Sequence, residues 1–218
     1  MTINKNQIVK KRSGSDKMKA VQSVSHANAP LPFWLVKRAQ NAAGAALTGG
    51  FFALNSALPV RPGGRVRIRF EARNLVLRFY LEETRNARRL SVSCLRNNIV
   101  EAFIDTKHDH ESYYHLVLNM LGECSMERVL RGNKARNWHC AVKTALSLTG
   151  DVWTADMQIP LAGLGVKTAR PGGVWGLNFV RTRFLKFGDF HYSSAAPGLP
   201  CFRCPGLSAM FQGTALKY

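Results

Sequence analysis

The segment from Val152 to Arg183 constrains the fold most, because it predicts two β-strands joined by a short connector. In the second half, VWGLNFVRTR, apolar Trp175, Leu177 and Phe179 alternate with other residues and so share one face of a strand. The first half, VWTADMQIP, mixes apolar and polar positions and ends at Pro160, which has no N–H for ladder pairing. Between them, LAGLG predicts a helical turn that RPGG then breaks.

A second strand pair is predicted between residues 65 and 83, RVRIRFEARNLVLRFYLEE, as a hairpin with an apolar face and an arginine-rich face. The outward residues include four arginines and a tyrosine: Arg65, Arg67, Arg69, Arg78 and Tyr80. The planar fork of arginine holds carboxylate, sulfate or phosphate groups through paired hydrogen bonds. We expect this arginine row to bind an anionic polymer, and a solvated, edge-protecting face is the alternative.

The charge of the chain points the same way. The 218 residues contain 31 Lys and Arg against 13 Asp and Glu, a formal net charge of +18, which predicts attraction to polyanions. A hydrophobic fraction of 46% suits one folded domain of the all-β, antiparallel sandwich class. We expect residues 1–32 to form a flexible basic tail and residues 33–218 to form the sandwich domain.

Neither a membrane span nor a secretory signal peptide is evident in the sequence. The most apolar long stretch, residues 39–60, is interrupted by polar side chains. The first 20 residues hold six Lys or Arg, and no apolar core follows them before Pro30. The localisation is therefore left open.

The strand segments follow one another in an order that resembles the family 9 carbohydrate-binding modules. Members carry W-x-x-E-x-x-I-P and then W-G-x-N-x-x-R, with strands D-x-V-E-x-F-x-D and one ending in N-x-x-G before them. The matching residues are Trp153, Asp156, Ile159 and Pro160, then Trp175, Gly176, Asn178 and Arg181, with NNIVEAFIDT (97–106) and SYYHLVLNMLGE (112–123) upstream. The resemblance covers about residues 33–218. It implies a CBM9-like antiparallel β-sandwich that binds polysaccharide or oligosaccharide without catalysis, in support of glycan degradation by a glycoside hydrolase, and usually outside the cytoplasm.

The resemblance also implies site residues. Glu101 and Asn119 match polar positions that bond sugar hydroxyls in the family, whereas Val117 stands where some members have Arg. The two Trp residues that clamp the sugar are missing here: Leu95 and Arg96 lie at one position and GLPCFRCPG at the other. Tyr192 is our candidate for a replacement platform. The other candidates are Tyr113, Tyr114, Trp138, Phe190 and Phe202, while Trp153 and Trp175 are expected in the core.

Metal binding is weakly indicated. The cluster DTKHDHE (105–111) offers calcium or zinc donors, but a solvated turn between two strands is the favoured interpretation. Calcium stays open as a cofactor and no metal ligand is assigned. Cys201 and Cys204 supply only two zinc ligands, and Cys94, Cys124 and Cys140 are expected to be small buried residues in strand-like surroundings.

Three functions remain after this reading. The leading one is a non-catalytic carbohydrate-binding module, with an acidic or sulfated glycan suggested by the basic charge. The second is a basic β-sandwich that binds nucleic acid or another polyanion through the arginine row. The third is an interaction module that has lost its sugar site. An enzyme is not favoured, because no G-x-S-x-G, P-loop or HExxH motif occurs.

Overall fold

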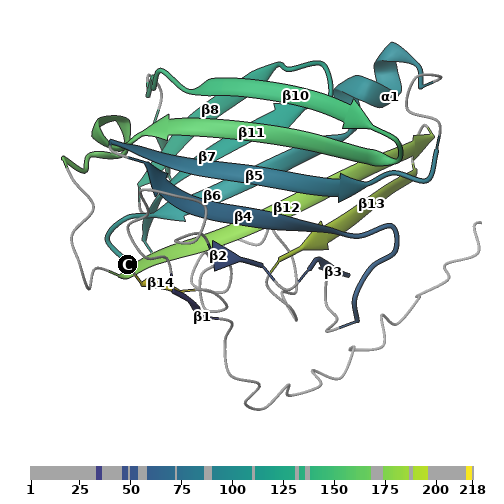
Figure 1. Ribbon diagram of the computed structural model, residues 1–218. Coiled ribbons are helices and arrows are strands. Elements are labelled where there is room, and N and C mark those ends of the chain that lie inside the picture. Colours follow the sequence, from purple (N-terminus) through teal and green to yellow (C-terminus); the bar gives the residue numbers. More distant parts are fainter. Residues whose placement is uncertain are drawn as a thin grey trace, which may run out of the picture.

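The computed structural model describes residues 33–35, 46–48, 50–53, 58–71, 73–85, 90–109, 111–130, 133–135, 138–167, 174–186, 189–195 and 215–217. These residues form two β-sheets packed face to face, with very little helix (Figure 1). The predicted all-β sandwich is therefore confirmed. The proposed tail, residues 1–32, lies outside the described residues.

The larger sheet is organised around one long strand, β12. One edge of this strand pairs with β6, and the other edge pairs first with β14 and then with β13, all antiparallel. Among the strands that the structure describes, the short β1–β14 contact alone is parallel. The strands of this sheet are β1 (Phe33–Leu35), β14 (Ala215–Lys217), β12 (Val174–Lys186), β6 (Ile99–Asp105), β7 (Ser112–Asn119), β8 (Cys124–Leu130), β9 (Asn133–Ala135), β13 (Asp189–Ser194) and β3 (Phe52–Ala53).

The smaller sheet contains the predicted hairpin and the strand that ends at Pro160. Its strands, in spatial order, are β10 (Lys143–Thr149), β11 (Val152–Pro160), β5 (Asn74–Glu82), β4 (Gly64–Glu71) and β2 (Ala46–Leu47). The predicted helical turn follows β11 as the 3-10 helix η3 (Leu161–Leu164), and Gly165 closes it in the left-handed region with φ of 70°.

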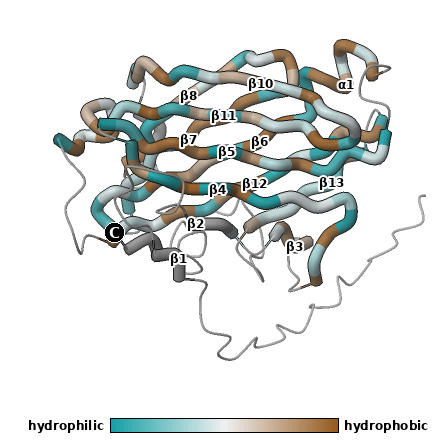
Figure 2. Tube along the Cα trace, in the orientation of Figure 1, coloured by the Kyte–Doolittle hydropathy of each residue, from teal (hydrophilic) through white to brown (hydrophobic). Residues whose placement is uncertain are grey.

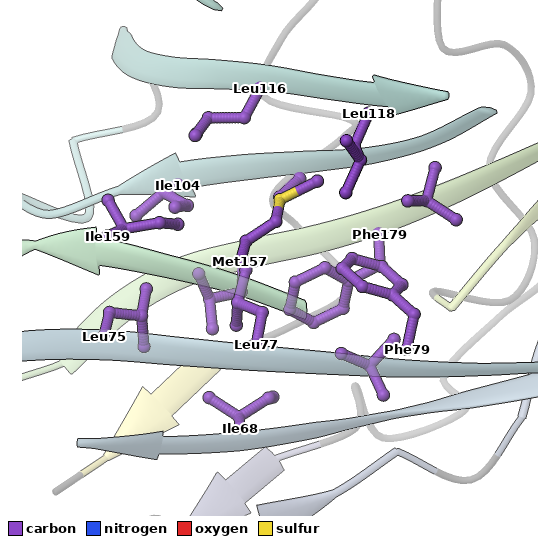
Figure 3. Packing of buried hydrophobic residues seen from close by; sticks show 14 of the residues in the cluster. Ile68, Leu75, Leu77, Phe79, Ile104, Leu116, Leu118, Met157, Ile159 and Phe179 are labelled. Atoms are coloured by element: carbon purple, nitrogen blue, oxygen red, sulfur yellow. The ribbon is translucent and has the colours of Figure 1, made fainter. Parts of the chain in front are cut away.

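Alternating side chains build the core between the sheets. Figure 2 shows polar and apolar residues alternating along β4 and β5, so that each strand offers one apolar face to the other sheet. Phe79 of β5 meets Phe179 of β12 edge to face, with ring centroids 5.6 Å apart, at the centre of the packing shown in Figure 3. Trp153 and Trp175 are both buried, as expected for core residues.

Cys94 is buried, as predicted, but the strand-like surroundings predicted for it were wrong. Cys94 lies on the one short helix, α1 (Val92–Asn97), whose first turn is capped by the Ser91 side chain accepting a hydrogen bond from the Cys94 N–H. Cys124 begins β8 and Cys140 lies in a connecting segment, and burial raises the pKa of both thiols. The Cys201–Cys204 pair lies outside the described residues.

Two arginines of β12 enter the interior, because they share the face that carries Trp175 and Phe179. Arg181 donates hydrogen bonds to the backbone carbonyls of Gly63 and Glu82. Arg183 donates to the carboxylate of Glu83 at 2.8 Å, and Arg85 binds the same carboxylate. These polar contacts join the end of β5 to the long strand of the opposite sheet.

Candidate functional site

Sheet register places Glu101, Asn119 and Tyr192 on one face of the larger sheet, the outer face turned away from the core, where Glu101 and Asn119 are each only 6% exposed. Asn119 pairs with Ile99 on β6, Ile99 pairs with Thr182 on β12, and Thr182 pairs with Tyr192 on β13. Glu101 lies two residues after Ile99 and therefore points the same way. Since neighbouring strands are about 4.8 Å apart, the backbones of Asn119 and Tyr192 are separated by about 14 Å.

Glu101 is part of a chain of three polar side chains across β6, β7 and β8. His115 lies between two carboxylates, with Nε2 2.8 Å from Glu101 Oε2 and Nδ1 2.9 Å from Glu127 Oε1. Its ring also stacks on Phe103, with centroids 4.3 Å apart. A small pocket of about 160 Å³ opens beside this chain and is lined by His115, Val117, Ser125, Met126 and Glu127.

The two carboxylates favour the charged form of His115. Burial alone would lower the pKa of the imidazole, but the hydrogen bonds with Glu101 and Glu127 outweigh burial and raise the pKa above its ordinary value. Both ring nitrogens then donate, one to each carboxylate. This arrangement fixes the orientation of the Glu101 carboxylate.

We therefore expect folding stability to depend on the protonation of His115. A base whose pKa is raised on folding contributes stability that is fully present below its unfolded pKa of 6.5 and is lost as pH rises through the folded pKa. Urea unfolding of the wild type from about pH 5 to about pH 8 should show a loss on the order of 1 kcal/mol that His115→Gln does not show. Parallel pH profiles of wild type and H115Q would contradict the assignment.

Asn119 caps the turn that follows β7. Its side-chain oxygen accepts hydrogen bonds from the backbone N–H groups of Leu121 and Glu123, both at 3.0 Å, and its amide donates to the Glu123 carboxylate at 2.7 Å. The end of α1 lies beside this turn, because the Met120 N–H donates to the Leu95 carbonyl and Arg96 pairs with Glu123 at 3.4 Å. Leu95 and Arg96, which stand at one of the missing Trp positions, are thus next to Asn119.

Tyr192 lies at the other side of this face, where aromatic rings meet a larger pocket. Its ring stacks with Phe190 at a centroid distance of 6.0 Å, and Phe190 contacts Phe184 at 5.0 Å. The pocket, here called the edge pocket, has a volume of about 420 Å³ and is lined by Ala53, Val60, Arg61, Pro62, Arg183, Phe190, His191, Tyr192 and Ser193. Tyr192 is therefore placed on a cavity large enough for a small ligand.

The arginine row lies on the opposite side of the molecule, on the outer face of the smaller sheet. The register pairs Arg65 with Tyr80 and Arg67 with Arg78, which confirms that these residues share the outward face. Arg78 donates two hydrogen bonds of 2.7 Å to Asp156, which raise its pKa. The other contacts are Arg69 with Glu71 at 2.7 Å and Arg65 over the Tyr80 ring at 5.4 Å.

The acidic cluster after β6 forms a turn, as predicted. The Asp105 carboxylate accepts a hydrogen bond from the Lys107 N–H, and Asp109 accepts from the N–H groups of Glu111 and Ser112. Within the part of the chain that the structure describes, no three His, Cys, Asp or Glu side chains are grouped to hold a metal ion. His110 lies outside that part, so calcium at this loop stays a prediction.

Sequence reasoning missed three residues that shape these sites. His115 lies four residues before Asn119 on β7 and therefore points outward as well, so the alternation of the sequence could have indicated its face. Glu127 on β8 is paired with His115 and shares that face. Arg183 lies on the inward face of β12, and its place in the edge pocket depends on β13 lying beside it.

Known structures that resemble this chain share its fold. The chain has a β-sandwich fold like that of the family 9 carbohydrate-binding modules. No protein-family model and no curated protein matches the sequence. Among the described residues, no helix has both the length and the apolar character needed to cross a membrane.

The solved structures that resemble it are distant in sequence. One is a protein from Bacteroides uniformis provisionally described as carbohydrate-binding, with a TM-score of 0.60, 19% identity and coverage of 86% of this chain and 99% of that chain. Another is a family 9 module from Caldicellulosiruptor kristjanssonii in complex with cellotriose, with a TM-score of 0.59, 11% identity and coverage of 85% and 93%. A family 9 module from Caldicellulosiruptor kristjanssonii in complex with glucose has a TM-score of 0.59 and 11% identity, with coverage of 85% of this chain and 95% of that chain. At sequence identities of 11–19%, the likeness shows a shared fold alone.

Proposed function

We propose that this protein is a non-catalytic carbohydrate-binding module that binds saccharide on the outer face of the larger sheet. The observation that carries the proposal is the register that puts Glu101, Asn119 and Tyr192 on one surface. The resemblance in sequence pointed to Glu101 and Asn119, and Tyr192 was the candidate for a replacement aromatic platform. The family 9 structures with cellotriose and glucose support a saccharide as the ligand class.

The chemistry of the face suits hydroxyl groups. A carboxylate accepts hydrogen bonds from sugar hydroxyls, and Glu101 is held in place by His115, so little rotamer freedom is lost on binding. Asn119 is tied into its turn through the side-chain oxygen, which fixes the direction of its amide. The stacked rings of Phe190 and Tyr192 provide the flat apolar surface that the C–H side of a pyranose needs.

The proposal extends to an acidic or sulfated glycan and to a role beside a glycoside hydrolase in glycan degradation. The net charge of +18 supports an anionic partner. The arginine row and the Glu101 face lie on opposite sides of the sandwich, so one sugar ring cannot contact both. A polymer would reach the arginine row only with a different stretch of its chain.

A nucleic acid or other polyanion on the arginine row is the second candidate. Among the described residues, Arg65 and Arg67 make no ion pair with a carboxylate, whereas Arg69 and Arg78 do. Two guanidinium groups are therefore available to phosphates. The missing Trp pair favours the third candidate, an interaction module without a sugar site.

A glycan array probed with three proteins tests the proposal. We expect wild type to retain saccharide binding at about 1 M salt, where the screening length falls to about 3 Å. Glu101→Gln should lose about 10-fold or more in affinity, since a hydrogen bond to a charged group is removed. Arg67→Gln, on the opposite face, is the matched control and should bind like wild type.

The opposite pattern would overturn the assignment. If E101Q binds saccharides like wild type while R67Q abolishes retention on both heparin and a DNA duplex, the arginine row is the functional surface. Circular dichroism and melting curves of both variants show whether either substitution has disturbed the fold.

A further inference from the structure

The edge pocket is a cavity that neither Glu101 nor Asn119 lines. It lies between β13 and the segment from Val60 to Pro62 that leads into β4, and its volume is about 420 Å³. Among the described residues, β3 pairs with β13 at Ser193 and Ser194, next to the pocket residues Phe190, His191 and Tyr192. Figure 1 shows β13 and β3 with the start of β4 at the same end of the sandwich. A cavity of this size accommodates one sugar residue.

Positive charge exceeds negative charge around this pocket. Four guanidinium groups lie in or behind its wall, and two carboxylates face them, an excess of two positive charges. The groups are Arg61, Arg85, Arg181 and Arg183 against Glu82 and Glu83. Asp189, which lies 3.6 Å from His191, reduces the excess to one while the imidazole is neutral.

Arg183 gives the pocket a buried cationic wall. Its side chain is 9% exposed, and one terminal nitrogen donates to Glu83 at 2.8 Å. Its Nε is buried without a hydrogen-bond partner in the described part of the chain. Burial and the neighbouring Arg183 lower the pKa of Arg181 to about 9, which still leaves that guanidinium charged at neutral pH.

Arg61 is the exposed cationic side chain of this pocket. Its side chain is 82% exposed, and it contacts Glu82 at 3.2 and 3.3 Å. Exposed pairs of this kind contribute little to stability, so Arg61 can leave Glu82 for a bound anion at small cost. A carboxylate or sulfate group entering the pocket would then meet two guanidinium groups, one from the segment before β4 and one from β12.

Phe190 provides the surface for the sugar ring. It is one of the large apolar side chains that stay exposed, at 38%, and its ring contacts those of Phe184 and Tyr192, with centroids 5.0 and 6.0 Å away. An aromatic face beside guanidinium groups matches a ring that carries both C–H groups and a negative charge.

We propose that the edge pocket binds an anionic sugar residue, with its carboxylate or sulfate group at Arg61 and Arg183 and its ring against Phe190. This rests on the proposed function in one respect, that the ligand is a saccharide. The pocket shares Tyr192 with the proposed outer face, but neither Glu101 nor Asn119.

Calorimetric titration with three tetrasaccharides tests the pocket: an oligogalacturonate, a heparin-derived sulfated one and neutral cellotetraose. We expect Arg61→Gln and Phe190→Ala each to weaken binding of an anionic tetrasaccharide about 10-fold or more, and R61Q to leave cellotetraose unchanged. Arg65→Gln removes the same charge from the opposite face and should have no such effect. The oligogalacturonate and sulfated arms distinguish carboxylate from sulfate.

The outcomes of this titration distinguish the edge pocket from the proposed saccharide site on the outer face. If E101Q loses neutral binding while R61Q binds anionic tetrasaccharides like wild type, only the edge pocket is overturned. If R61Q loses anionic binding while E101Q is unchanged, only the outer-face site is overturned. Equal losses in R61Q and R65Q would mean general attraction by charge and would overturn the pocket, as would an absence of anionic tetrasaccharide binding to wild type.

Discussion

Replacing Glu83 with Gln should destabilise the protein by about 3–5 kcal/mol, because it leaves buried guanidinium groups without a countercharge. Glu83 is 1% exposed. It accepts hydrogen bonds of 2.8 Å from Arg183, and of 2.8 and 2.9 Å from Arg85. Burial by itself would raise the pKa of Glu83, but these donors lower it to about 2.

Urea unfolding of Glu83→Gln against wild type measures this effect, with Glu71→Gln as the control. Glu71 also pairs with an arginine, at 2.7 Å, but its side chain is 40% exposed, so its loss should cost at most about 1 kcal/mol. A stability of E83Q within about 1 kcal/mol of wild type would show that the interior tolerates its arginines without Glu83.

The ion pairs of Glu83 also predict how the stability of the protein changes in acid. A carboxylate whose pKa is lowered on folding contributes stability that is present above its unfolded pKa of 4.5. That contribution is lost as pH falls from there towards about 2. The difference between wild type and E83Q should therefore narrow over this range.

Replacing Phe79 with Ala should cost about 3–5 kcal/mol through the cavity it leaves between the sheets. Phe79 is fully buried on β5, and its edge-to-face contact with Phe179 joins the two layers of the sandwich (Figure 3).

The neighbouring residue provides the control for this prediction. Tyr80→Ala removes an aromatic ring from the outward face of the same strand, where it lies under Arg65, and should cost about 1 kcal/mol or less. Thermal and urea unfolding of both variants make the comparison. Equal losses for F79A and Y80A would contradict the assigned faces of β5.

Local alternation predicted the strands well, because each buried strand carries its own apolar period. The predicted strand 152–160 coincides with β11, and the predicted hairpin corresponds to β4 and β5. The prediction failed at Cys94, where apolar residues among polar ones suggested a strand. There the Ser91 cap starts a short helix instead.

The sites were harder to predict, because they depend on pairing between distant segments. The resemblance pointed to Glu101 and Asn119 one by one, and the register of β6 with β7 is what places them on one face. Neither the His115 bridge nor the contact between Glu83 and Arg183 has a signal in the sequence, since 100 residues separate the latter pair. The separation of the arginine row from Glu101 also required the packing of two sheets, and whether one domain spans residues 33–218 stays a prediction.

The measurement that tests the central claim most directly is an NMR titration of the ¹⁵N-labelled protein with cellotetraose and the oligogalacturonate at high salt. We predict shifts of amide signals on the outer face of the larger sheet, at Glu101, His115 and Val117 and around Tyr192, while the amide signals of the arginine row stay unchanged. Shifts confined to β4 and β5 around Arg65 and Arg67, or no shifts at all, would contradict a sugar site on this face.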